Sequence, residues 1–312
     1  MPQLVLKIDV DTLRGSREGV PNLARLLRKH QANATFLFSL GLDHTGWALR
    51  RAFRPGFFQK VSRTSVVEHY GLKTLMYGVL LPAPDIGKRC AAELRAVRDD
   101  GFECGVHTWD HVVWQDNVRQ QNAAWTHTQM QQAFDRFQAI FGNPAQTHGA
   151  AGWQMNPHAF AELDAFGLRY ASDERAALND DGSLCDPQAG PHRVSALGRT
   201  LNCIQMPTTL PTLDELLGRT VGGKVITQSN IAATLLALTE IQRDHVYTLH
   251  AELEGQKLAP IFEQLLLGWA AQGYQLTAMA DYFPTIENTS LPVQPIQWGT
   301  LPGRSGDLLI AA

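Results

Sequence analysis

Short apolar runs alternate with helical repeats along most of the chain. Runs such as LVLKI at 4–8 are typical of buried strands, whereas apolar residues three or four positions apart predict helices. The expected strands lie at 4–8, 34–39, 102–107, 168–172, 202–206, 245–250 and 274–279, and the expected helices at 19–30, 85–100, 126–141, 156–167, 229–242 and 257–271. This alternation predicts parallel strands with right-handed crossovers. We therefore expect an α/β fold, a distorted (β/α)7-8 barrel.

Three segments depart from this alternation. Residues 44–80 form an insertion after the second expected strand. Residues 178–200 are polar and rich in Gly, Pro and Asp, which predicts a loop over the strand ends. Residues 285–312 show little periodicity and are expected to form an irregular C-terminal tail. The chain is thus expected to hold one barrel domain over 1–284, followed by the tail.

Composition excludes some classes of partner. Of the 312 residues, 44% are apolar and 18% charged, and a net charge of −3 gives no basic surface suited to nucleic acid. No run reaches the roughly 18–20 apolar residues that span a bilayer, and the start lacks a basic segment followed by an apolar one. These features favour a cytoplasmic protein.

Side chains able to bind metal or transfer protons stand at or just after the ends of expected strands. They are Asp9 and Asp11 after 4–8, His107 and His111 around the end of 102–107, Asp173 after 168–172, and His250 at the end of 245–250. Because the ends of barrel strands open onto one face, residues far apart in sequence converge there. We expect a metal centre with an acid/base pair.

The spacing of these residues suits a divalent ion. His107 and His111 are four apart, so one helical turn directs both imidazoles to the same ion. Asp9 and Asp11 are two apart and share one face of a strand. Two histidines and one carboxylate leave positions for water and substrate, and the four cysteines lack C-x-x-C spacing. The set favours zinc, with manganese, cobalt and nickel as alternatives.

Four motifs occur in an order that resembles a known family. The segments KIDVDT, HTWDH, YASD and YTLH are similar, in this order, to the motifs of the NodB-type polysaccharide deacetylases, carbohydrate esterase family 4. The resemblance covers about residues 4–280 and implies a barrel of the NodB deacetylase type. It also implies Asp9 as catalytic base, His250 as general acid, and three metal ligands, which are Asp11, His107 and His111.

Longer segments resemble one branch of this family, the 4-deoxy-4-formamido-L-arabinose-phosphoundecaprenol deformylases. They are LKIDVDTLRGSREGVP (6–21), GVHTWDHVVWQ (105–115), AAGW (150–153), RYASD (169–173), QMPTTLPTLDE (205–215) and VYTLHAELEG (246–255). This likeness implies metal-dependent hydrolysis of a formamide on an undecaprenyl-phosphate-linked sugar at the inner face of the cytoplasmic membrane. Formate and the 4-amino sugar lipid are the implied products, within the aminoarabinose modification of lipid A that gives polymyxin resistance.

One feature departs from the wider family. Its members carry an arginine that pairs with the catalytic aspartate, whereas this chain has Ala150, Ala151 and Gly152 near that position. We expect Arg14, Arg17 or Arg175 to supply this charge or to bind substrate.

Further residues are expected to support the acid or to bind the sugar. Asp173 is expected to orient His250 and keep it charged, and His148 stays open as an alternative acid. The following residues are candidates for substrate contacts: Glu252 and Glu254 for hydroxyls or the product ammonium, and Trp109 and Trp153 for stacking on the sugar ring. Solvated glutamates and tryptophans packed in the wall of the site are the alternatives.

The insertion at 44–80 combines basic and aromatic residues. Between positions 47 and 80 six lysines or arginines face one acid, Glu68, in an otherwise acidic chain. Basic residues among aromatic ones are typical of a helix that lies on an anionic membrane surface. A helical hairpin with a solvated basic face is the alternative. Together with the implied lipid-linked substrate, this pattern favours peripheral docking to the membrane.

Other functions fit part of the pattern. A deacetylase of N-acetylated polysaccharide or oligosaccharide would use the same residues. Two histidines and a carboxylate also form the metal site of non-haem Fe(II) oxygenases, although Asp9 and His250 favour hydrolysis. A non-catalytic metal or lipid carrier is the third alternative.

Overall fold

A set of parallel strands runs through the centre of the protein. The structure, a computed structural model, describes residues 1–48, 71–186, 188–287, 289–302 and 306–311. Strand β1 (Gln3–Val10) pairs in parallel with β9 (His245–His250), β2 (Thr35–Ser39) and β10 (Gln275–Thr277), and β2 pairs in parallel with β3 (Glu103–Thr108). From Leu4 onward β1 is buried throughout, which explains its unbroken apolar run.

Backbone hydrogen bonds continue this sheet into a ring. Val106 of β3 bridges to His148, and the His148 carbonyl accepts from Ser172 N, beside β4 (Tyr170–Ala171). Strand β4 pairs in parallel with β6 (Arg199–Gln205), and Thr209 N donates to the Val246 carbonyl of β9. The expected distorted barrel is therefore confirmed, with short and irregular strands on the side opposite β1.

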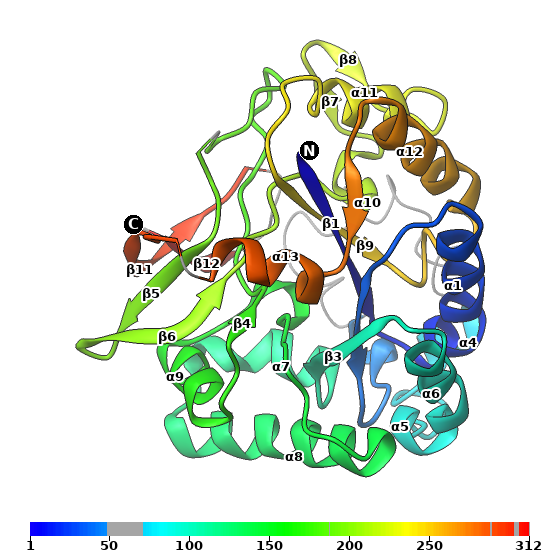
Figure 1. Ribbon diagram of the computed structural model, residues 1–312. Helices are drawn as coiled ribbons and strands as arrows, with labels where there is room; N and C mark the ends of the chain where they lie inside the picture. Colours follow the sequence, from blue (N-terminus) through cyan, green and yellow to red (C-terminus); the bar gives the residue numbers. More distant parts are fainter. Residues whose placement is uncertain (49–70, 187, 288, 303–305, 312) are drawn as a thin grey trace.

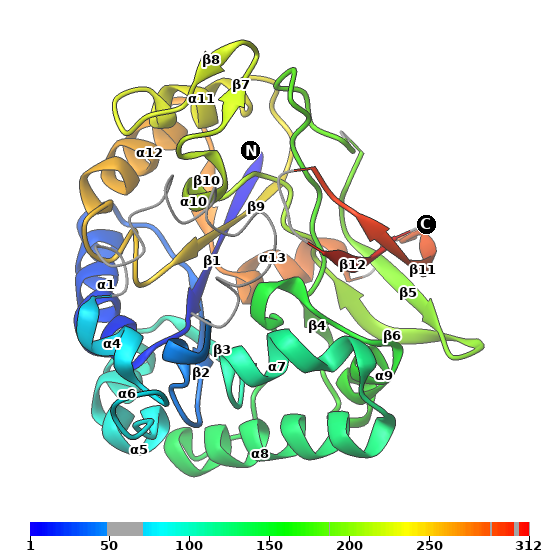
Figure 2. The same cartoon turned by 180° about the vertical axis from the view of Figure 1, so that it is seen from behind.

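Helices surround these strands, as Figures 1 and 2 show from opposite sides. Those of the outer layer are α1 (Val20–Lys29), α4 (Leu72–Met76), α5 (Ile86–Arg89), α6 (Ala91–Asp99), α7 (His111–Asn117), α8 (Ala123–Phe141), α9 (Pro157–Ala165), α10 (Leu213–Leu216), α11 (Ile231–Ala237), α12 (Ala259–Ala271) and α13 (Met279–Ile286). Single turns occur at η1 (Gly15–Gly19), η3 (Val118–Gln120) and η4 (Ala151–Trp153). Asn122 and Asn156 cap α8 and α9 through their side chains, and Gly142 ends α8 at φ 81°. The periodicity predicted α1, α5 with α6, α8, α9, α11 and α12, but it did not predict α4, α7, α10 or α13.

A second sheet changes two expectations. Residues 178–200 were expected to form a loop, but β5 (His192–Ala196) pairs with β6 in an antiparallel hairpin. The expected irregular tail forms β11 (Val293–Thr300) and β12 (Asp307–Ala311), and β11 joins β5 in parallel. Figure 1 shows this sheet projecting to the side of the barrel. A short hairpin, β7 (Thr220–Val221) with β8 (Lys224–Val225), lies beside α11.

Part of the insertion lies outside the described residues. Positions 49–70, which carry most of its basic and aromatic residues, are not described. On either side, Trp47 donates through Nε1 to the Gly78 carbonyl, and the Trp47 and His44 rings stack 3.9 Å apart. None of the helices in the described part of the chain has the length and apolarity needed to cross a membrane.

Candidate metal centre and acid/base pair

Three side chains with metal-binding atoms meet at the ends of β1 and β3. Asp11 follows β1, His107 lies in β3, and His111 is the first residue of α7. Their ligand atoms lie within 4.8 Å of one another. His107 Nε2 is 3.2 Å from Asp11 Oδ1, and His111 Nε2 is 3.5 Å from Asp11 Oδ2. The strand-end positions therefore converge as the sequence predicted.

The two histidines do not share a helical turn, which corrects the expectation from their spacing. His107 belongs to β3, and the chain turns at Asp110, whose side chain accepts from Val113 N and caps α7. His111 thus begins a helix that is held in place by the residue before it. The direction of both imidazoles comes from a strand end and a helix start rather than from helical periodicity.

The hydrogen bonds of these residues leave metal-binding atoms without partners. His107 Nδ1 lies 2.5 Å from the Gly149 carbonyl, which only accepts, so Nδ1 carries a proton and, in the neutral ring, Nε2 offers its lone pair to a metal. Among the described residues, no hydrogen-bond partner is found for His107 Nε2 or Asp11 Oδ1, both buried. Buried polar atoms rarely stay unpaired. Two imidazole nitrogens and a carboxylate fit a divalent cation such as zinc.

The electrostatics of the site also favour a bound cation. Burial alone would raise the pKa of Asp11, but the His111 and His107 imidazoles outweigh burial and hold that pKa well below its usual range. Burial opposes protonation of His107, yet Asp9 and Asp11 raise its pKa. Negative charge therefore gathers between the two imidazoles, and a bound cation would compete with protons for these nitrogens.

Asp9 lies beside this cluster with a lysine as its ion-pair partner. Its carboxylate is buried, and Lys7 Nζ is 3.6 Å from Oδ2. No hydrogen-bond partner is found for Asp9 Oδ1 in the described part of the chain, and His107 Nδ1 is 3.8 Å from that atom. The sequence led us to expect an arginine here. Lys7 instead reaches Asp9 from two positions earlier on the same face of β1.

His250 ends β9 directly opposite Asp9. The two residues are register partners in the β1–β9 pair, and Ala251 N donates to the Asp9 carbonyl. His250 Nδ1 lies 4.0 Å from Asp214 of α10. Burial disfavours the charged ring, but Asp214, followed by Asp11, raises the pKa of His250 to about 9. A base candidate and a protonated acid candidate thus lie next to each other beside the metal-binding cluster.

Sequence comparisons show the family of this chain. The family model described as polysaccharide deacetylase matches residues 4–171, more than half of the chain. The chain belongs to the polysaccharide deacetylase family. A probable 4-deoxy-4-formamido-L-arabinose-phosphoundecaprenol deformylase, ArnD, from Shewanella sediminis (strain HAW-EB3) is 33% identical over 301 residues, which are 96% of this chain and 92% of the relative. A protein of the same printed name from Wigglesworthia glossinidia brevipalpis is 31% identical over 294 residues, 94% of this chain and 96% of the relative.

A solved structure from the same family has the same fold. The crystal structure of a putative polysaccharide deacetylase from Mycobacterium smegmatis superposes with a TM-score of 0.63 at 14% identity, covering 96% of this chain and 94% of that one. The family and the fold agree with the expectation from the strand-end motifs. Family membership also makes this chain a hydrolase of the deacetylase class.

Asp173 pairs with His148 rather than with His250, the partner that we expected from the sequence. Its Oδ1 lies 2.6 Å from His148 Nδ1 and accepts from Ala150 N, while Gln205 donates to Oδ2. The carboxylate beside His250 is Asp214. Asp173 therefore fixes His148 and the 148–150 loop, and this corrects its expected role with His250. His148 is buried inside that pair, which favours His250 over His148 as the acid.

The two glutamates after His250 point into the protein rather than to solvent. Glu252 accepts from the backbone nitrogens of Asp11 and Thr12, and burial and Asp11 raise its pKa. Glu254 accepts from His250 N at 2.9 Å, and burial raises its pKa to about 7. Both hold the backbone of site residues, so the alternative of solvated glutamates is wrong and their main contacts are structural.

The predicted tryptophans and arginines lie around the site in supporting positions. Trp153 is buried, donates to Thr208 Oγ1 and has both Lys7 and Arg175 over its ring. The Trp109 ring packs under the Arg136 guanidinium at 4.9 Å. Packing in the wall thus describes both tryptophans better than an open stacking platform.

The arginines expected beside Asp9 have other contacts. Arg175 pairs with both carboxylate oxygens of Glu215. Arg14 pairs with Glu18, and Arg17 lies toward Cys90, whose thiol it contacts. Lys7 therefore takes the place near Asp9 that we expected an arginine to fill.

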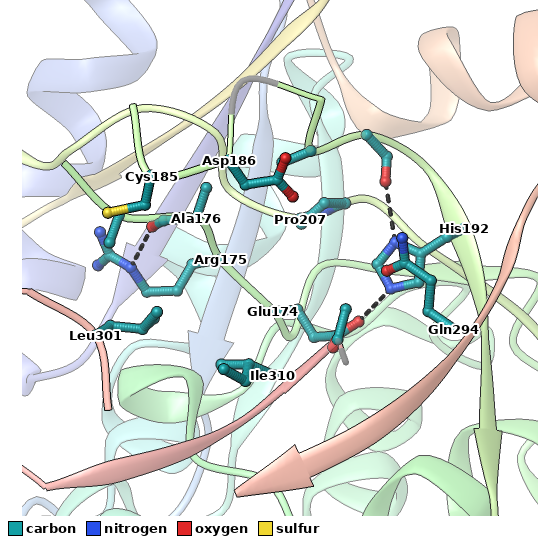
Figure 3. Close-up of a pocket in the computed structure, with 14 residues that line it drawn as sticks. Glu174, Arg175, Ala176, Cys185, Asp186, His192, Pro207, Gln294, Leu301 and Ile310 are labelled. Carbon is teal, nitrogen blue, oxygen red and sulfur yellow. Dashed lines mark hydrogen bonds and ion pairs between the residues drawn. The ribbon is translucent and has the colours of Figure 1, made fainter. Parts of the chain in front are cut away.

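A second histidine–carboxylate pair lines a pocket away from the metal-binding residues. Figure 3 shows His192 beside Glu174, with Arg175 on the opposite side of the pocket. The cavity has a volume of about 130 Å³. His192 Nδ1 is 2.9 Å from Gly190 O and Nε2 is 2.6 Å from Glu174 Oε2. The lining includes neither Asp11 nor His107. The pocket lies between the 174–192 segment and the C-terminal strands and is distinct from the metal centre.

Sequence reasoning missed two residues of the site. Lys7 continues the alternation of Asp9 and Asp11, so a basic residue at that position was a usable signal. Asp214 lies within the 205–215 segment, but no strand periodicity places it near His250. Its neighbour Glu215 forms a capping box with Thr212, which fixes α10 and hence Asp214.

Proposed function

We propose that this protein is a metal-dependent hydrolase that removes the formyl group from a formamido sugar linked to a polyprenyl phosphate. The observation that carries the proposal is the position of Asp9 and His250 as register partners on neighbouring strands, next to the cluster of Asp11, His107 and His111. The curated relatives, at 31–33% identity over almost the whole chain, are named as formamido-arabinose lipid deformylases, which supports the formyl group and the lipid-linked sugar.

The ligands in this proposal are Asp11, His107 and His111. A divalent ion held there would polarise the amide carbonyl and favour ionisation of the attacking water. Zinc suits the ligand set, and manganese, cobalt or nickel also accept it. Asp11 contributes an anionic ligand because its carboxylate stays ionised between the two imidazoles. Glu252 stabilises this arrangement by holding the backbone of Asp11 and Thr12.

Asp9 and His250 divide the proton transfers. Asp9 accepts a proton as water adds to the formamide carbon, and its Oδ1 has no other hydrogen-bond partner among the described residues. His250, protonated with a pKa of about 9, donates to the sugar nitrogen as the carbon–nitrogen bond breaks. The products are formate and a free amine. Asp214 keeps His250 in its charged form until that step.

The insertion and its neighbours are proposed to dock on an anionic membrane. Leu72, Val79 and Leu80 are 65%, 53% and 77% exposed, beside the basic segment at 49–70 that lies outside the described residues. Arg14 borders this region, since a side chain at Gly71 would meet its guanidinium at 3.0 Å. We infer that Arg14 and Arg17 lie on the side from which a lipid phosphate approaches.

Co-sedimentation with vesicles tests this docking. Serine at Leu72, Val79 and Leu80 together should reduce binding to vesicles that contain phosphatidylglycerol, and deletion of 47–77 should reduce it further. Ile241→Ser is the matched control, because Ile241 is 84% exposed elsewhere on the surface. Unchanged binding of the deletion variant would exclude the insertion as the docking element.

Deacetylation of N-acetylated saccharides remains the second candidate because the same family performs it. An oxygenase finds no support from the family assignment, and a non-catalytic carrier does not need Asp9. The assay compares formate release from the lipid-linked formamido sugar with acetate release from N-acetyl oligosaccharides, without oxygen and with or without chelator. Metal-dependent formate release that is lost in Asp9→Asn, but kept in the exposed control Asp135→Asn, is expected. Acetate release without formate would assign the deacetylase instead.

A further inference from the structure

Lys7 is a buried charge whose ion-pair partner is Asp9, with Asp173 as a second carboxylate in its surroundings. Its side chain is fully buried in β1, and Nζ donates to the Ser172 carbonyl at 2.9 Å. Nζ is 3.6 Å from Asp9 Oδ2 and 5.2 Å from the centre of the Trp153 ring. Desolvation of the ammonium lowers its pKa, while the Asp9 carboxylate opposes that change. The charge is thus surrounded by a carboxylate, a carbonyl and an aromatic face.

The surrounding backbone makes room for this lysine. A Cβ at Gly149 would lie 2.8 Å from Lys7 Cε and 2.4 Å from Leu37 Cδ1. The same glycine accepts from His107 Nδ1 through its carbonyl. Glycine is therefore needed where the lysine, the metal-binding histidine and β2 approach one another.

A buried ammonium is expensive in free energy. Removing an isolated charge from water costs several kcal/mol even after relaxation, and a single ion pair rarely recovers all of it. An apolar side chain would fill the same place in the barrel at lower cost. A role at Asp9 explains why a lysine is buried here. Asp9 Oδ2 faces Lys7, while Asp9 Oδ1 has no hydrogen-bond partner in the described part of the chain.

We propose that Lys7 is a positioning residue that fixes the Asp9 carboxylate through Oδ2 and leaves Oδ1 to accept the proton of the attacking water. The inference rests on the proposed hydrolysis. Lys7 stays protonated and transfers nothing: the proton moves from water to Asp9 as the new carbon–oxygen bond forms. Arg175, over the same Trp153 ring, is engaged with Glu215 and does not take this place.

The kinetic test is a cycle of four full-length, zinc-loaded proteins. They are wild type, Lys7→Met, Asp9→Asn and the double variant. Lys7→Met should lower kcat about 100-fold, because a carboxylate that is no longer held loses alignment, with KM within about threefold and zinc content unchanged. In the Asp9→Asn background the same change should lower kcat less than about threefold. The kcat of Lys7→Arg should be at least about tenfold higher than the kcat of Lys7→Met.

Equal losses in both backgrounds would overturn the proposal, because Lys7 would then act independently of Asp9. Loss of zinc from Lys7→Met would also overturn it. Lys29→Met is the matched control, since Lys29 lies on the surface with Glu263 as its partner, and it should leave kcat and KM unchanged.

A second readout does not depend on turnover. In urea unfolding of the same four proteins with chelator present, the midpoint shifts of Lys7→Met and Asp9→Asn should not add in the double variant. Additive shifts would contradict the pairing. If wild type releases neither formate nor acetate while the shifts are non-additive, the proposed function fails and the pairing of Lys7 with Asp9 stands.

Discussion

Two histidine–carboxylate clusters in this chain differ in how their hydrogen bonds are satisfied. His192 donates through one nitrogen to the Gly190 carbonyl and through the other to Glu174, so both ring nitrogens are used. His107 uses one nitrogen for the Gly149 carbonyl, and no partner is found for Nε2 among the described residues. Both histidines are buried and both have a raised pKa.

The difference separates a structural pair from a binding site. A raised pKa alone marks both clusters and would assign function to each. Both clusters contain an unpaired buried atom, Glu174 Oε1 in one and His107 Nε2 in the other. Three ligand atoms converge only at Asp11, His107 and His111 within the described residues, whereas both ring nitrogens of His192 already have acceptors. The convergence of three ligand atoms on an imidazole nitrogen without a partner, rather than a shifted pKa value, therefore identifies the metal centre in the described part of the chain.

The largest expected effect follows from removing a ligand. His107→Gln should abolish binding of one zinc ion and reduce hydrolysis to the level of the chelated wild type, because two ligands do not hold the ion firmly. Metal content by mass spectrometry and product release measure the two effects. His192→Gln should keep both zinc binding and hydrolysis. If His192→Gln lost the zinc ion while His107→Gln kept it, the metal centre would lie at His192 instead.

A smaller loss is expected from Gly149→Ala. The added methyl group meets Leu37 and Lys7 at distances that force movement, so we expect destabilisation by about 1–3 kcal/mol and reduced activity through His107. Urea unfolding and product release check this prediction. Gly190→Ala is the control near His192, because its Cβ would meet only the Gln188 carbonyl, at 3.7 Å. If Gly149→Ala and Gly190→Ala lowered stability and activity equally, the close packing around Gly149 would not matter for the site.

Asp214→Asn should have a modest effect that grows with pH. The Asp214 carboxylate raises the pKa of His250 to about 9, so its removal lowers that pKa and depletes the imidazolium at alkaline pH. In the pH profile of kcat/KM, the decline at alkaline pH should therefore begin at a lower pH than in wild type. At neutral pH, kcat/KM should fall by a few fold. Asp135→Asn, on the exposed face of α8, serves as control. A limb that does not move would exclude Asp214 as the partner of the acid.

The strand-end residues were predictable, whereas several of their partners were not. Asp9, Asp11, His107 and His250 end buried parallel strands, and such strands bring their ends to one edge whatever the connecting loops do. The pairing of Asp173 with His148 depends instead on the 147–149 segment, which bridges β3 outside any regular strand. Hydrophobic periodicity carries no information about such a segment.

The C-terminal sheet escaped prediction for a similar reason. Strand β11 contains Pro295 and has no buried residue along its length, so its sequence lacks the apolar alternation of a core strand. It forms because β5 and β12 offer hydrogen-bonding edges on either side. Those edges come from distant parts of the chain, and local sequence does not reveal them.

The smallest effect on activity is expected for His192→Gln, although its effect on stability should depend on pH. Burial opposes the charge on His192, but Glu174 raises its pKa above the unfolded value of roughly 6.5. The folded protein therefore holds this proton more tightly than the unfolded chain. Stabilisation by the charged pair is fully present below about pH 6.5 and is lost as the pH rises through the higher folded pKa.

Unfolding of wild type and His192→Gln at pH 6 and pH 9 measures this dependence. At pH 6 the variant should be less stable by about 1.5–3 kcal/mol, the usual range for a hydrogen bond to a charged group. Toward pH 9 the difference should shrink, because wild-type His192 loses its proton as the pH rises through its folded pKa, while Gln still donates to Glu174. A difference that grows with pH would mean that His192 is neutral in the folded protein, and the contrast with His107 would then rest on hydrogen bonding alone.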